Sequence, residues 1–116
     1  MVRMSACLPV LDPACLRELG EELGDPAGAA AFLDGYRELL PVRMDSISCA
    51  VAAQDFEAAM DRVLSLKVTS TMVGARQLAG LSTELEHLVR AESWAAAGAA
   101  MHGLARAVAA LTPVLT

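Results

Sequence analysis

The stretch VLSLKVTSTMVGARQLAGLSTELE, residues 63–86, has the pattern of two helices that meet at a glycine. On a wheel of about 100° per residue, the run 56–73 places one set of residues on a single side, with the i, i+3, i+4, i+7 spacing of a core-facing helix. This set is Phe56, Ala59, Val63, Leu66, Ser70 and Val73. The pattern predicts an amphipathic central helix that Asp55 caps and Gly74 ends.

The opposite side of this helix should face water, yet it mixes apolar residues with acids. It carries Glu57, Asp61, Leu64, Ser65, Val68 and Met72, and Lys67 and Thr71 border it. Single exposed leucines are ordinary, but a strip of Leu64, Val68 and Met72 is less so. A partner that buried such residues fully would gain on the order of 1.5–3 kcal/mol for each. Two interpretations stay open: the strip docks a partner, or a neighbouring helix covers part of it.

Helix signals recur along the rest of the chain. Asp12 before Pro13, and Asp25 before Pro26, each read as an N-cap followed by proline at the first helical position. They predict helices over about 13–23, which stops near Gly24, and over about 26–53. Since a proline inside a helix removes a hydrogen bond, Pro41 predicts a kink or break near Leu40 in the second helix.

Two more helices follow the central one. The first should run from Ala75 to about Arg90, and the second should open at Glu92 or Ser93 and end near Leu111, before Pro113. With connections of only a few residues, the simplest assembly is all-α: an antiparallel four-helix bundle with an additional short N-terminal helix. The length predicts a single domain over residues 1–116, with the bundle over about 10–112.

Composition excludes several function classes. Fourteen acids against nine Lys and Arg give a formal net charge of −5, which argues against nucleic acid as a partner. The sequence has no uninterrupted apolar run of about 18 residues and no signal peptide, so we expect a cytoplasmic protein without a membrane partner. Cys7, Cys15 and Cys49 are expected to be free thiols. No spacing indicates a metal site, a cofactor or an enzyme's acid–base pair.

One string in the opening stretch has a recognisable order and spacing. Val63-Leu64-Ser65-Leu66-Lys67-Val68-Thr69-Ser70 is followed by Gly74-Ala75, Leu78 and Leu85-Glu86. It resembles the signature of histidine-containing phosphotransfer (HPt) domains, the four-helix-bundle intermediates of bacterial phosphorelays, which reads approximately A-H-x-L-K-G-[SA]-[SA], then G-A, L and L-E. Flanking matches are Leu11-Asp12, Phe32, Leu39-Leu40 and Asp55, so the resemblance covers roughly residues 10–112.

Two departures fall at the chemistry of that family. The phospho-accepting histidine aligns with Leu64, which has no nucleophile, and a glycine expected to let a receiver domain approach aligns with Val68. Lys67, which the resemblance implies would face the phosphoryl group, remains. The resemblance therefore implies a pseudo-HPt domain, not an enzyme, which binds a receiver domain or a hybrid histidine kinase without carrying phosphate. The candidate partner-binding residues are Glu57, Asp61, Leu64, Lys67, Val68, Thr71 and Met72.

Alternatives remain at this point. His87 and His102 are the only histidines and are the candidates for a non-standard phosphocarrier, although each reads more simply as a surface or packing residue. The hydroxyls of residues 69–71 are expected to bond to carbonyls one turn back. The strip could also pair with a symmetry mate in a homodimer, which sedimentation of a Leu64→Glu variant would test.

Overall fold

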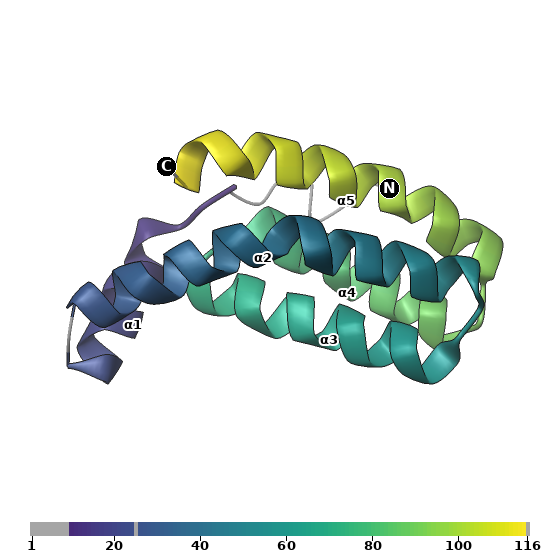
Figure 1. Ribbon diagram of the computed structural model, residues 1–116, viewed down its shortest axis with the longest axis horizontal. Coiled ribbons are helices and arrows are strands. Elements are labelled where there is room, and N and C mark those ends of the chain that lie inside the picture. Colours follow the sequence, from purple (N-terminus) through teal and green to yellow (C-terminus); the bar gives the residue numbers. More distant parts are fainter. Residues whose placement is uncertain (1–9, 25, 116) are drawn as a thin grey trace.

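The computed structural model describes residues 10–24 and 26–115, and these ranges contain helices and no strand (Figure 1). The predicted cap at Asp25 and the predicted free thiol of Cys7 lie outside the described residues. The elements are α1 (Pro13–Leu23), α2 (Pro26–Ala52), α3 (Phe56–Val73), α4 (Arg76–Arg90), α5 (Trp94–Leu111) and the 3-10 helix η2 (Thr112–Leu115).

Helices α2, α3, α4 and α5 form an antiparallel four-helix bundle, as the sequence predicts. Each packs on the next along the chain, and α5 also packs on α2, so the four helices enclose one core (Figure 1). Short connections produce this up-and-down order because they leave consecutive helices no room except beside each other. The additional helix α1 packs against α2 and α3 at one end of the bundle.

Small and medium aliphatic side chains fill the core. The largest fully buried ones include Leu40, Ile47, Leu66, Leu78, Leu85, Leu104 and Leu111. The predicted core side of α3 is buried at Ala59, Val63, Leu66, Ser70 and Val73. Phe56 was also predicted to lie in this core, and that prediction is wrong: its side chain is 40% exposed, because it is the first residue of α3 and lies at the end of the bundle.

The predicted caps of α1 and α3 are confirmed. Asp12 Oδ1 accepts a hydrogen bond from the Ala14 N–H at 3.0 Å, and Asp55 Oδ1 accepts one from the Ala58 N–H at 3.1 Å. These bonds satisfy amide groups that have no partner within the helix. Gly24 and Gly74 end the same two helices with φ of 66° and 83°. This left-handed conformation costs glycine little, which explains its use there.

Of the kink or break that was predicted near Leu40, helix α2 shows no break. It runs without interruption through Pro41, whose side chain is exposed. Proline removes one hydrogen bond, to the carbonyl one turn earlier, but on the solvent side of a helix water can bond to that carbonyl. Leu40, before Pro41, and Ile47, after it, are both buried, so core packing holds both halves of the helix in place.

The starts of the last two helices agree with prediction to within a residue or two. Helix α4 begins at Arg76, after Ala75 in the cap position, and α5 begins at Trp94, after Ser93. Neither cap residue makes a side-chain capping bond. Packing against neighbouring helices therefore contributes more to these two starts than local capping does.

The junction of α3 and α4 is where α1 is anchored. The Asp12 N–H donates to the Gly74 carbonyl at 2.7 Å, and Arg76 Nε bonds to Asp12 Oδ2 at 2.8 Å. The guanidinium hydrogen bond holds the pKa of the Asp12 carboxyl below its ordinary value, so this carboxylate stays charged at neutral pH. A Cβ atom at Gly74 would lie 2.4 Å from the Asp12 carbonyl oxygen. The close approach of α1 therefore requires glycine.

The segment Trp94–Leu115, which comprises α5 and η2, is long and apolar enough to span a membrane by length and composition alone. In the structure, α5 packs on α4 and α2 as a bundle helix. Its inward residues Ala97, Leu104, Ala107 and Leu111 are buried. Its apolar composition is thus partly explained by the core that it helps to form.

Candidate partner-binding face

The predicted strip lies on the solvent side of α3. Val68 is 55% exposed and Met72 is 40% exposed, whereas Leu64 is partly covered by its surroundings. Helix geometry explains this placement, because the buried residues of α3 occupy the opposite side. Glu57 and Asp61 are exposed on the same side as the strip. We call the surface formed by Leu64, Val68 and Met72 the α3 strip.

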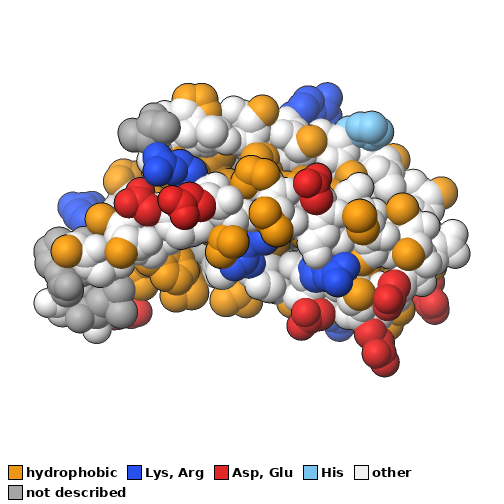
Figure 2. Space-filling model, in the orientation of Figure 1, with side chains coloured by type: hydrophobic (Ala, Val, Ile, Leu, Met, Phe, Trp, Pro, Cys, Tyr) orange, Lys and Arg blue, Asp and Glu red, His pale blue; other side chains and the backbone are white. Residues whose placement is uncertain are grey.

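Acidic side chains lie at one end of α3 and also among apolar side chains elsewhere on the same face. Figure 2 shows one group of acidic side chains near the end of the molecule where α3 begins, others over α2, and hydrophobic side chains spread along α2 and α3. Any partner that covers the α3 strip therefore meets an apolar surface bordered by carboxylates at one end.

Lys67 lies beside the strip and is bound within the bundle. Its Nζ donates to Glu86 Oε1 at 2.8 Å, and Arg90 Nη2 donates to Glu86 Oε2 at 2.7 Å. The Glu86 side chain is only 10% exposed, so this ion pair joins α3 to α4 in a largely covered position. Mainly through the Lys67 hydrogen bond, the pKa of the Glu86 carboxyl falls below its ordinary value. At neutral pH Glu86 is therefore a carboxylate that is shared by the Lys67 ammonium and the Arg90 guanidinium, so the three groups together keep a positive charge.

The other edge of α3 is bonded to α2. Arg43 Nη1 donates to Ser65 Oγ at 2.7 Å, and Arg62 Nη1 donates to the Ser46 carbonyl at 3.1 Å. Arg43 Nε is buried, and no hydrogen-bond partner for it exists among the described residues. Both arginines thus lie between α2 and α3 and make bonds to neutral oxygen atoms.

The hydroxyl groups of residues 69–71 divide into two kinds. Thr69 Oγ1 donates to the Ser65 carbonyl and Thr71 Oγ1 to the Lys67 carbonyl, each at 2.8 Å, which confirms the predicted bonding one turn back. Ser70 differs, because its Oγ lies 2.8 Å from the Tyr36 hydroxyl in the core. Burial raises the pKa of Tyr36 to about 12, so both hydroxyls remain neutral. None of the three has a base beside it among these contacts.

Two exposed apolar residues on α2 were not predicted from the sequence as part of a binding surface. Leu39 is 46% exposed and Val42 is 62% exposed. Leu39 lies between Tyr36 and Arg43 in α2, and both of these side chains bond to residues of α3. Leu39 is therefore in the part of α2 that runs alongside α3. The signal in the sequence was weak, because Leu39 and Leu40 are adjacent and only tertiary packing decides which of them faces the core.

The two histidines lie away from the α3 strip. His87 is exposed and lines a groove of about 630 Å³ between α4 and α5, together with Glu84 and Arg106. His102 is exposed on α5 and lines a smaller groove beside Trp94. Within the described ranges, no group of three or more His, Cys, Asp and Glu side chains could hold a metal ion.

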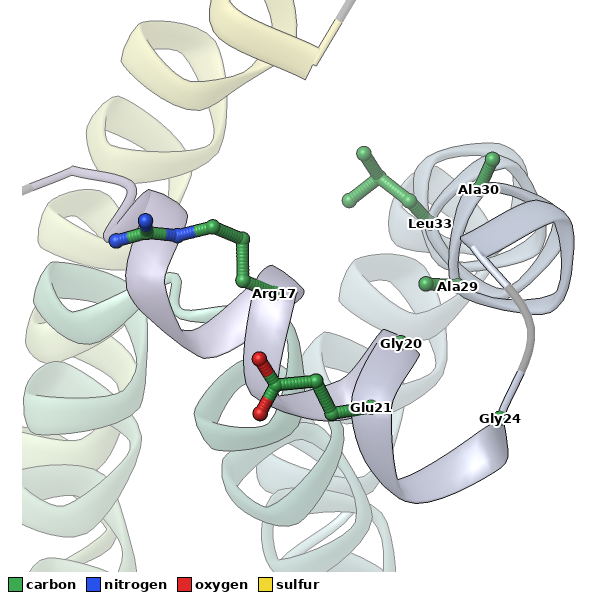
Figure 3. Close-up of a pocket in the computed structure, with 7 residues that line it drawn as sticks. All are labelled: Arg17, Gly20, Glu21, Gly24, Ala29, Ala30 and Leu33. Carbon is green, nitrogen blue, oxygen red and sulfur yellow. The ribbon is translucent and has the colours of Figure 1, made fainter.

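A further groove, of about 640 Å³, lies between α1 and α2 and is mostly apolar (Figure 3). It is lined by Arg17, Gly20, Glu21, Gly24, Ala29, Ala30 and Leu33. In Figure 3 Leu33 projects from α2 toward α1, whereas the charged ends of Arg17 and Glu21 point away from α2. The lining residues include none of the α3 strip, so this groove is a separate feature.

Comparison with known proteins places the chain in a family. The model of the Hpt domain family matches residues 29–112, which is most of the chain, and the protein belongs to this family. No curated protein sequence matches the chain. The crystal structure of histidine-containing phosphotransfer protein B (HptB) from Pseudomonas aeruginosa PAO1 is similar with a TM-score of 0.81 and 28% identity. The match covers 92% of this chain and 91% of HptB. The protein is thus an HPt domain of phosphorelay signalling.

Proposed function

We propose that this HPt domain is a pseudo-phosphotransfer domain, which binds a receiver domain or a hybrid histidine kinase without carrying phosphate at the family's usual position. The observation that carries the proposal is Leu64. It aligns with the phospho-accepting histidine of the HPt signature and lies on the solvent side of α3. A leucine side chain has no lone pair to attack phosphorus, so no phosphoramidate can form there.

The surface around Leu64 supports binding as the function that remains. HPt domains interact with receiver domains and with histidine kinases in phosphorelays. Here the exposed side chains of Val68 and Met72 continue the apolar surface along α3, and Leu39 and Val42 add to it on α2. Covering these side chains would remove apolar area from water, which favours association. The candidate contact residues are those of the α3 strip together with Glu57, Asp61, Lys67 and Thr71. Leu39 and Val42 of α2 are added to them. With such a partner, we expect the protein to act in the cytoplasm.

Nuclear magnetic resonance titration tests the binding face directly. Receiver domains from the same organism, added one at a time to labelled protein, should shift backbone signals of residues 57–72 and of the α2 residues near Leu39. Signals from the groove between α4 and α5 serve as the internal control. If no receiver or kinase domain shifts signals of residues 57–72, the proposal is wrong.

A phosphorylation assay tests the other half of the proposal. The protein should acquire no stable label from a phosphorylated receiver or from acetyl phosphate. The double variant His87→Gln, His102→Gln should behave like the unaltered protein. Stable label that disappears in the double variant would instead identify a phosphocarrier that uses one of these histidines.

A further inference from the structure

A cation lies between the α3 strip and the exposed apolar residues of α2. Arg43 is one turn after Leu39 on α2, and its Nη1 donates to Ser65 Oγ of α3 at 2.7 Å. Ser65 follows Leu64 in the chain and precedes Val68 by three residues, so the guanidinium lies close to apolar residues of both helices. Figure 2 shows basic side chains along the line where α2 and α3 meet, with hydrophobic side chains beside them.

The charge of Arg43 is not neutralised by an acid of the described structure. Arg43 belongs to none of the ion pairs within residues 10–24 and 26–115, whose basic members are Arg37, Lys67, Arg76 and Arg90. Its hydrogen bond to Ser65 goes to a hydroxyl oxygen, which carries no net charge. A positive charge is therefore available to a partner at the edge between α2 and α3.

The Arg43 side chain is also held in place before any partner arrives. Its Nε atom is buried without a hydrogen-bond partner among the described residues, and the bond to Ser65 fixes the end of the side chain. Part of its hydration is thus already lost on folding, so an ion pair formed there gains from the lower local dielectric constant. Less side-chain freedom is lost on binding as well. Arginines in such surroundings are among the residues that contribute most at protein interfaces.

The other charged residues around the α3 strip differ from Arg43 in this respect. Lys67, on the side toward α4, is already bound to Glu86 at 2.8 Å. Asp61 is exposed on α3, but within the described ranges it forms no ion pair with Arg43 or Arg62. Arg62 follows Asp61 directly in the chain, so the adjacent carboxylate offsets part of its charge. Arg43 therefore combines an unpaired charge with a partly covered and fixed side chain.

From these observations we propose that Arg43 selects the partner of the α3 strip by binding an aspartate or glutamate side chain of the receiver domain. This inference rests on the proposed function, because it names the chemistry that the receiver must present. A receiver with a carboxylate opposite Arg43 would form an ion pair in partly covered surroundings. A receiver with only apolar groups there would bury the guanidinium without a counter-charge, which is costly, so it would be rejected.

Isothermal titration calorimetry with an unphosphorylated receiver domain tests the inference. The probe is a receiver domain from the same organism that shifts signals of residues 57–72. The buffer contains no phosphate and no phosphate donor, so the anions that the receiver brings are its own carboxylates. Arg43→Gln should weaken binding at least about threefold. Arg106→Gln, which removes the same charge from an exposed position of α5, is the matched control and should keep the original affinity.

Salt and two further variants separate the charge of Arg43 from its structural bond. Raising the salt from about 0.1 to about 1 M should weaken binding of the unaltered protein more than binding of Arg43→Gln, because screening becomes stronger. Arg43→Lys keeps the charge and should retain most of the salt dependence. Ser65→Ala removes the acceptor of the Arg43 bond but keeps the guanidinium, so it should weaken binding less than Arg43→Gln does. Circular dichroism checks that each variant keeps its helical content.

A double-mutant cycle identifies the group on the partner. Exposed aspartates and glutamates of the receiver are changed one at a time to asparagine or glutamine, and each variant is titrated with the unaltered protein and with Arg43→Gln. One of these changes should weaken binding to the unaltered protein but have little further effect on binding to Arg43→Gln. That acid is then the residue that Arg43 binds.

The outcomes separate this inference from the proposed function. If the receiver binds Arg43→Gln and Arg106→Gln equally well, selection by Arg43 is wrong, whereas partner binding stands. The same conclusion follows if no acid of the receiver is coupled to Arg43, if Ser65→Ala weakens binding as much as Arg43→Gln does, or if a kinase domain binds and no receiver does. If no receiver or kinase domain shifts signals of residues 57–72, the proposed function is wrong and so is this inference.

Discussion

At residue 64 the chain carries a side chain that can make apolar contacts and nothing else. Of its neighbours, Val68 presents a branched side chain where the signature that the sequence resembles has glycine, whereas Lys67 and Glu86 match that signature and are bound to each other. A histidine placed at position 64 would therefore stand beside a bulky neighbour and an ammonium that is already bound to a carboxylate. The chemistry of this site depends on several residues rather than on Leu64 alone.

Gly74 provides a prediction about stability at the scale of one residue. Alanine there would have to adopt a φ of 83°, and its Cβ would lie 2.4 Å from the Asp12 carbonyl oxygen. The backbone conformation alone should cost about 1–3 kcal/mol, and the collision adds to it. Urea denaturation of Gly74→Ala should show a loss of at least that size.

Gly98 supplies the matched control, because it lies inside α5 and a Cβ there would meet no atom within 4 Å. Gly98→Ala should raise the free energy of unfolding by about 0.5–1 kcal/mol, since alanine favours the helix. If Gly74→Ala were as stable as the unaltered protein, the anchoring of α1 on Gly74 would be incorrect.

Glu86 provides a prediction about pH. Its pKa is lower in the folded protein than its ordinary value of about 4.3 in an unfolded chain, mainly through the Lys67 hydrogen bond. A lowered carboxyl pKa adds stability at pH values above the unfolded pKa, and this stability is lost as the pH falls through the lower folded pKa. Urea denaturation between pH 7 and pH 3 should show the loss. Glu86→Gln should make the acidic decline shallower, although Asp12 still contributes to it.

The conservative change Glu57→Gln is the control for this measurement, because Glu57 is exposed at the start of α3. Glu57→Gln should keep most of the loss of stability that occurs between pH 7 and pH 3. If Glu57→Gln and Glu86→Gln reduced this loss equally, the Lys67–Glu86 ion pair would not be its main source.

At the scale of the element, α3 has two faces that serve different purposes. The buried face, with Leu66 and Val63 fully covered, holds the helix in the bundle. The outer face is not needed for that packing, so its side chains can be chosen for a partner. The hydroxyl groups of Thr69 and Thr71 donate hydrogen bonds to backbone carbonyls of α3 itself.

Helix α2 offers a test of how an interior proline is tolerated. Pro41 is exposed in an unbroken helix, so alanine at this position would restore a hydrogen bond without disturbing the core. Pro41→Ala should raise the free energy of unfolding by about 1–3 kcal/mol, which is the penalty of an interior proline reduced by the greater freedom of the unfolded chain. Thermal or urea denaturation measures this.

Asp45→Ala, at another exposed position of α2, is the control for helix propensity. It should raise stability by no more than about 0.7 kcal/mol. A Pro41→Ala variant less stable than the original protein would contradict the view that packing tolerates the proline rather than requiring it.

At the scale of the whole molecule, the bundle brings α2 and α4 to opposite edges of α3. Besides the apolar packing, Ser65 and Ser70 of α3 form side-chain hydrogen bonds to α2, and Lys67 forms one to α4. The α3 strip is therefore bordered on one side by the ion pair between Lys67 of α3 and Glu86 of α4, and α2 presents exposed apolar residues of its own. Rigid helices on both sides hold this surface in one shape, which reduces the ordering cost of binding.

Local signals in the sequence determined the helices. Asp12 and Asp55 predicted where α1 and α3 begin, Gly74 where α3 ends, and the spacing of apolar residues predicted the buried side of α3, with Phe56 as the exception. Each of these signals acts within about one helical turn, so neighbouring residues are enough to read it. The HPt signature in the same stretch also allowed the family to be predicted.

Tertiary structure alone decided how the surroundings of Leu64 are arranged. The Lys67–Glu86 bond joins residues 19 positions apart, and the Tyr36–Ser70 contact joins residues 34 positions apart. The exposure of Leu39 beside buried Leu40, and the partial cover of Leu64, likewise depend on the neighbouring helices. The physical reason is that rotation and register of packed helices follow from many weak contacts summed over the whole core, and no single stretch of sequence contains that sum.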